Sequence, residues 1–289
     1  MSTIVVAPER APWAKSAGRL LRRPTARLGA GIVAIFLLLT VAAPLLAPYS
    51  PFDQDFAAAL EGPSALHPFG TDQYGRDVLS RVVYGSRIAL LSILVADGLG
   101  LVVGSLLGLV AGFYGRWVDS AVMRIVDVLL AFPYLLLALI IVAALGPGLL
   151  NSMIAIGVVY TPQYARLIRG QVLSVKTTEF VLAAQAIGAS RRRVMLRHIL
   201  PNSFTPVMVM ATLSAGTVVV ETAGLSFLGM GSQPPSPDWG AILSEGQSYF
   251  LTSWWIATFP GLAIFAVVIG FNLLGDALRD HFDPRRRKE

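Results

Sequence analysis

The chain has 289 residues, of which 55% are hydrophobic and only 14% are charged, and its mean hydropathy is +0.66. A soluble domain of this length would need far more charge to cover its surface, so we expect most of the chain to lie in the lipid bilayer. The absence of cysteine excludes disulfides, thiolate metal sites and cysteine nucleophiles. We attribute the net charge of +6 to membrane topology and expect no nucleic-acid partner.

The first apolar run covers residues 28–48 and is long enough to cross a bilayer as a helix of about 20 residues. The basic segment before it is also typical of a secretory signal. However, the run is longer than the apolar region of a usual signal, and Pro44 and Pro48 lie where cleavage would fall. We therefore predict an uncleaved first transmembrane helix.

Five further apolar runs predict transmembrane helices over residues 88–113, 118–145, 149–167, 204–228 and 254–274. The predicted fold is an all-α integral membrane protein with six transmembrane helices. We divide the chain into a basic N-terminal segment (1–27), the first transmembrane helix with its outer segment (28–87), a transmembrane domain (88–278) and a basic tail (279–289). Residues 168–203 form a loop outside the membrane.

The distribution of basic residues predicts the orientation. Six spans place both termini on one side, and 20 of the 23 Lys and Arg residues fall on that side, which leaves Arg76, Arg81 and Arg87 on the other. Basic residues are retained on the cytoplasmic face of membrane proteins. We therefore expect both termini and the loop 168–203 to be cytoplasmic.

The second span carries a glycine at every fourth position, at Gly100, Gly104, Gly108 and Gly112. In lipid, small residues at this spacing let two helix backbones approach closely. We interpret the stripe as a packing face.

Two carboxylates, Asp97 and Glu221, lie inside predicted spans. An ionisable group in mid-membrane costs about 2.5–3.5 kcal/mol even on lenient scales, so each should face the protein interior or a wet cavity. Either residue could line a translocation path, or be satisfied by a neighbouring hydroxyl or backbone group.

Two segments on the outer face, 67–81 and 233–240, combine turn-forming residues with charges. We expect structured loops that either cap the helix bundle or form a docking surface for a partner. The candidate docking residues are Arg76, Asp77, Asp238 and Trp239, since exposed charges steer association and an indole suits an interface.

The cytoplasmic loop predicts two short helices that meet at Gly188. Phe180, Ala184 and Ile187 share one helical face, Ser190 is a suitable N-cap for the second helix, and Pro201 should end it. An apolar ridge beside basic residues on a cytoplasmic surface indicates a protein partner.

The pattern Ala183-Ala184, then Gly188, then His198-Ile-Leu-Pro201 resembles the cytoplasmic "EAA" signature of ATP-binding-cassette (ABC) importer permeases. Further segments are similar to the C-type permease subunit of dipeptide, oligopeptide and nickel importers: residues 67–81, 145–151, 164–170, 225–229, 233–241 and 272–280. Leu182 stands where the signature has glutamate.

The resemblance implies a type I ABC importer permease fold with a cytoplasmic coupling helix, in the bacterial inner membrane. It implies a homologous second permease, two ATPase subunits that bind ATP and Mg, and an external substrate-binding protein that docks on the outer loops. The implied ATPase-coupling residues are Glu179, Ala183, Ala184, Gly188, Arg191, Arg192, His198 and Pro201.

Other classes fit less well. None of the three lysines follows a glycine as a Walker loop requires, and the three histidines form no catalytic or metal-binding motif, so we expect a non-catalytic subunit without cofactor or metal. A proton-coupled secondary transporter remains the alternative class. Peptides are the expected substrate, while nickel chelates, glutathione and sugars remain open.

Overall fold

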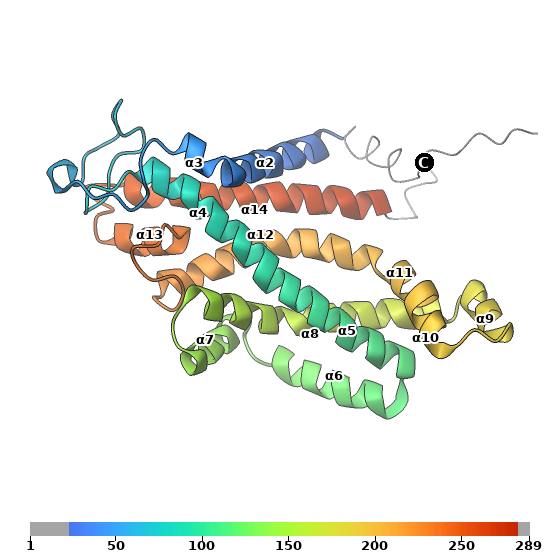
Figure 1. Ribbon diagram of the computed structural model, residues 1–289. Coiled ribbons are helices and arrows are strands. Elements are labelled where there is room, and N and C mark those ends of the chain that lie inside the picture. Colours follow the sequence, from blue (N-terminus) through green and yellow to red (C-terminus); the bar gives the residue numbers. More distant parts are fainter. Residues whose placement is uncertain (1–22, 283–289) are drawn as a thin grey trace, which may run out of the picture.

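The computed structural model describes residues 23–282, which form helices and the loops that connect them, with one isolated β-bridge between Thr71 and Asp77 and no strand in that range. The long helices run side by side (Figure 1). The all-α prediction is confirmed. Predictions that concern residues 1–22 and 283–289 lie outside the described part of the chain.

Helix α2 (Pro24–Val41) packs along α14 (Trp255–Phe282) and is followed by the short α3 (Ala43–Leu46). The first span therefore begins earlier and ends earlier than predicted. Pro24 favours the start of a helix, because its fixed φ suits the first turn and its missing N–H has no partner there anyway. After α3, an irregular segment with the 3₁₀ turn η1 (Phe56–Ala58) reaches Asp77.

The second span belongs to one continuous helix of 37 residues, Val78–Tyr114, made of α4 (Val78–Ser92), the π-helical turn η2 (Ile93–Asp97) and α5 (Gly98–Tyr114). Residues 78–81, predicted as loop, are its first turn. The cause is a cap: the Asp77 carboxylate accepts a hydrogen bond from the Ser80 backbone N–H at 2.7 Å.

The third predicted span is broken into α6 (Arg116–Leu130) and α7 (Tyr134–Leu145), which meet at 95°. A single straight helix over residues 118–145 was therefore wrong. Pro133 explains the break, because the residue before a proline disfavours the helical conformation and the proline N–H is missing from the ladder.

Four helical stretches are long and apolar enough to cross a membrane, namely α2, Val78–Tyr114, α12 (Thr205–Phe227) and α14, and the bent α6–α7 pair would make a fifth. The remaining predicted span, residues 149–167, corresponds to α8 (Leu149–Lys176), which is longer than predicted and more polar than the other spans. Nearly half of its residues are buried against other helices. In a membrane bundle, polar side chains can lie on helix faces that contact protein and not lipid.

The two ends of the bundle differ. At one end lie α13 (Trp239–Gln247) and the outer loop before α4, and we call this the α13 end (Figure 1). At the other, the α9 end, lie α9 (Glu179–Ala186), α10 (Arg191–Arg193), the π-helical turn η3 (Val194–Ile199) and α11 (Leu200–Ser203). The start of α2 and the end of α14 are also at the α9 end, where Arg23 donates a hydrogen bond to Asp280.

The glycine stripe is a packing face, as predicted, and its partner is α8. A Cβ atom added at Gly100 would lie 2.8 Å from Cβ of Tyr160, and one at Gly104 would lie 2.5 Å from the carbonyl oxygen of Thr161. At Gly108 the added atom would lie 2.2 Å from the carbonyl oxygen of Ala165. Only glycine lets α5 and α8 approach this closely.

We predict that Gly108→Ala destabilises the bundle by about 1–3 kcal/mol, because the new methyl group overlaps the α8 backbone. The measurement is thermal unfolding of the purified chain in detergent. Gly98→Ala is the matched control, since a Cβ there meets no atom within 4 Å. Equal melting temperatures of the two variants would contradict the packing role of the stripe.

Candidate functional site: the helix–turn–helix at the α9 end

The turn between α9 and α10 is built around Gly188, whose φ is +83°. The Gly188 N–H donates to the Gln185 carbonyl at 3.0 Å, and the Ala189 N–H donates to the Ala184 carbonyl at 3.1 Å. These two bonds form a Schellman motif, which satisfies the last carbonyls of a helix with a residue in the left-handed conformation. The predicted turn at Gly188 is confirmed.

The second helix begins as predicted, because the Ser190 side chain accepts a hydrogen bond from the Arg193 N–H. Pro201 does not end it. The helical path continues from α10 through the π-helical turn η3 into α11, where Pro201 occupies the first turn. A proline is tolerated there because the wide turn before it relieves the clash that a proline ring makes in a regular helix.

The inner side of this helix–turn–helix is anchored in the core. Val181, Val194 and Ile199 are fully buried, and Ala184, expected on the exposed ridge, is also buried. The exposed large apolar side chains of this segment are Phe180, Leu182, Ile187 and Leu196, of which Ile187 is 87% exposed. Phe180 and Ile187, seven residues apart, share one face of α9, and we call this face the ridge. Leu182, where the signature has glutamate, is also exposed but lies on a different face of α9.

The other members of the predicted coupling set are mostly exposed. Glu179, Arg191 and Arg192 are exposed, as are Ala183 and Pro201. His198 is half-buried, and its carbonyl accepts a hydrogen bond from the Asn202 amide at 2.6 Å. An apolar ridge with charged margins and a rigid turn has the composition of a protein-docking surface.

The two intramembrane carboxylates lie inside the bundle, and sequence reasoning missed their partners. The Tyr164 hydroxyl donates to the Asp97 carboxylate at 2.6 Å, and the Ser214 hydroxyl donates to the same oxygen at 2.8 Å. The Tyr160 hydroxyl donates to Glu221 at 3.1 Å. Tyr160 and Tyr164 lie one turn apart on α8, and this spacing was the available signal.

These bonds join η2, α8 and α12 at the centre of the molecule. Both carboxylates are buried and accept hydrogen bonds from neighbouring hydroxyl groups, as the second of the two predictions for them states. A contact with substrate stays a prediction for Asp97 and Glu221.

A buried group of charges holds the α13 end together. Arg76 Nε and Arg81 Nη1 each lie 2.6 Å from Asp72 Oδ2, and Arg76 Nη2 and Arg81 Nη1 each lie 2.8 Å from Glu245 Oε2. Both arginine side chains are at most 1% exposed. The two cations and two anions compensate one another and tie the outer loop and α4 to α13.

The expected exposure of the four docking residues is wrong, because all four are buried. Arg76 belongs to the charge group, and Asp77 caps α4 and also contacts His67 at 3.0 Å. Asp238 caps α13 by accepting from the Ala241 N–H at 3.0 Å, and the Trp239 indole donates to the Val82 carbonyl at 2.9 Å. Burial raises the pKa of the Asp238 carboxyl, and the cap bonds lower it in part. These four residues therefore hold the loops at the α13 end in place.

A bundle of helices long and apolar enough to cross a membrane defines the class: a multi-pass membrane protein. The chain belongs to the family described as "Binding-protein-dependent transport system inner membrane component", which matches residues 104–288. Residues 11–63 match the "N-terminal TM domain of oligopeptide transport permease C". The chain is therefore a multi-pass inner-membrane permease subunit of an ABC importer, a system that also comprises ATPase and substrate-binding components.

Several characterised relatives align over almost the whole chain. A dipeptide transport permease, DppC, of Alkalihalophilus pseudofirmus is 45% identical over 96% of this chain and 91% of its own length. The probable D,D-dipeptide permease DdpC of Escherichia coli is 43% identical over 94% of this chain and 91% of its own length. The glutathione permease GsiD of Pectobacterium atrosepticum is 42% identical over 96% of this chain and 92% of its own length.

Among solved structures, the methionine ABC transporter MetNI in inward-facing conformations has a similar fold, with a TM-score of 0.57 at 19% identity. The match covers 70% of this chain and 97% of that one.

The buried charge group yields a double-mutant test. Arg81→Met leaves Asp72 and Glu245 without one cation and should destabilise the chain by about 3–5 kcal/mol. Arg81→Met combined with Glu245→Gln removes one charge of each sign and should cost less than Arg81→Met alone. Chemical unfolding of Arg81→Met, Glu245→Gln and the double variant, each compared with the unsubstituted chain, gives the coupling energy. If the two substitutions simply add, the charges do not act as one group.

Proposed function

We propose that the chain forms the translocation path of an ATP-driven importer of dipeptides and other short peptides, together with a homologous second permease. The support for peptides is that relatives 45% and 43% identical to this chain are dipeptide permeases. Glutathione, itself a short peptide, is the second candidate, because relatives at 42–43% identity carry that substrate in their names.

The observation that carries the transport mechanism is the ridge on the helix–turn–helix. We propose that Phe180 and Ile187 enter a cleft of an ATPase subunit, with Glu179, Arg191 and Arg192 as polar contacts at its margin. ATP and Mg bind to the ATPase subunits, and this chain contributes no catalytic group. The α9 end and both termini then face the cytoplasm, and the α13 end faces the external binding protein.

Motion of the ATPases would reach the path through α8. This helix leads directly into α9 and carries Tyr160 and Tyr164, which hold Glu221 and Asp97. A rigid turn at Gly188 matters here, because a flexible one would absorb the displacement. A carrier driven by protons would use the two carboxylates instead and would have no need of an ATPase-docking ridge.

The test is uptake of a labelled dipeptide into proteoliposomes that hold the complete transporter with its binding protein. We expect uptake to require ATP hydrolysis and to persist when an ionophore dissipates the proton gradient. Glutathione as competitor separates the two candidate substrates. Uptake that needs the proton gradient but not ATP would overturn the proposal.

In the same assay, Gly188→Val should abolish coupling while the protein still inserts, because a left-handed φ costs an L-residue about 1–2 kcal/mol and misdirects the ridge. Gly170→Val is the matched control, since it too has open space around its Cβ position but lies in regular helix. Wild-type uptake by Gly188→Val would show that the turn does not transmit the motion.

A further inference from the structure

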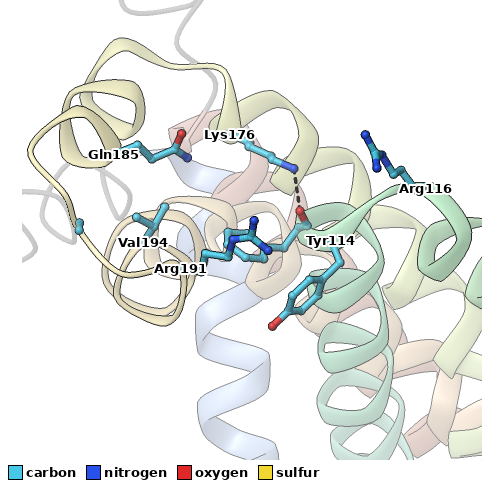
Figure 2. A pocket seen from close by; sticks show the side chains of 8 residues that line it. Tyr114, Arg116, Lys176, Gln185, Arg191 and Val194 are labelled. Carbon is cyan, nitrogen blue, oxygen red and sulfur yellow. Dashed lines mark hydrogen bonds between the residues drawn. The ribbon is translucent and has the colours of Figure 1, made fainter.

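A basic cavity lies between the helix–turn–helix and the end of α5. Its volume is about 530 Å³, and its lining includes Arg116 from the start of α6, Lys176 from the end of α8, and Arg191 from α10 (Figure 2). None of its lining residues is an Asp or Glu. Three positive groups around one opening with no lining carboxylate make a site for an anion.

Several polar groups that line this cavity have hydrogen-bond donors without a partner in the described part of the chain. Among residues 23–282, the guanidinium groups of Arg116 and Arg191 have no hydrogen-bond or ion-pair partner. The side-chain amide of Gln185 also has none in this range. Lys176 donates one hydrogen bond, to the Phe113 carbonyl at 2.6 Å, which leaves two of its three donors. Guanidinium, ammonium and amide groups together match the oxygens of a phosphate.

The surroundings of the cavity favour a lipid over a soluble anion. Tyr114 lines the cavity at the end of the helix Val78–Tyr114, which is long and apolar enough to cross the membrane. From Tyr114, an exposed apolar stripe runs back along α5 at every fourth residue, through Val110, Leu106 and Val102. Trp117, the residue after Arg116, is 77% exposed, and exposed tryptophans are typical of the membrane–water boundary.

We propose that this cavity binds the phosphate headgroup of an anionic phospholipid from the inner leaflet, with the acyl chains lying along the α5 stripe. Basic pockets beside membrane helices at the cytoplasmic surface are suited to such headgroups. The lipid would contact α5, α6, α8 and α10 at once. It would therefore stabilise the contact between the helix–turn–helix and the rest of the bundle, next to the surface that the ATPase subunits would bind. The inference rests on the proposed function only for the cytoplasmic orientation of this end.

The experiment compares phosphatidylglycerol with phosphatidylcholine of identical acyl chains, bound to the purified full-length chain and quantified by mass spectrometry. We expect the chain to prefer phosphatidylglycerol. Arg116→Gln combined with Arg191→Gln should reduce that preference by at least about tenfold, since each basic residue near an anionic lipid contributes on the order of 1 kcal/mol. If the double variant does not fold, Arg191→Gln alone tests the same site, because Arg191 is exposed.

Arg124→Gln combined with Arg197→Gln is the control, since it removes the same charge from two exposed arginines that do not line the cavity. An equal loss in both double variants would show a non-specific surface effect and overturn the site.

Displacement of the lipid by equimolar glycerol phosphate would identify a soluble anion instead. Displacement by stoichiometric ATPase subunits would assign the cavity to the ATPase contact. None of these readouts depends on transport, so failure here is distinguishable from failure of the proposed function.

Discussion

The close contact of α5 with α8 is the constraint on which the rest of the structure depends. Four glycines let the two backbones meet, and the contact fixes α8 in the centre of the bundle. The position of α8 determines where its two tyrosines hold the carboxylates of η2 and α12. Since only two residues separate α8 from α9, the same contact also sets where the helix–turn–helix projects. The Lys176 ammonium adds a direct bond between the ends of α8 and α5.

The two ends of the molecule differ in whether their charged side chains are exposed or buried. At the α9 end, charges and apolar side chains are left exposed around a rigid turn, which suits a surface that binds partners. At the α13 end, charges are buried and paired, which suits a structure that must keep one shape while other subunits act on it. Breaking a buried ion pair is costly, so such a group favours a single arrangement of loop, α4 and α13. The chain thus has exposed charged and apolar groups around a rigid turn at the α9 end, and a buried group of paired charges at the α13 end.

Features with a local cause could be predicted from the sequence. The glycine stripe and the turn at Gly188 follow from the spacing or backbone freedom of single residues, and both are present. Features that join distant residues could not. Arg81 and Glu245 are 164 residues apart, so nothing in either segment shows that their charges meet. Arg76, a member of the same group, was expected at the surface. The bend at Pro133 was missed because hydropathy is continuous across it, although the proline itself was visible.

Site-directed labelling tests the central claim, that the helix–turn–helix is a cytoplasmic docking surface for the ATPases, most directly. The chain has no cysteine, so Ile187→Cys and Leu251→Cys each give a single thiol, at positions that are 87% and 97% exposed. A membrane-impermeant thiol reagent added outside intact spheroplasts should label position 251 and not position 187. In inside-out vesicles, position 187 should be labelled, and bound ATPase subunits should protect it. Labelling of position 187 from outside, or labelling that ATPase subunits leave unchanged, would contradict the account.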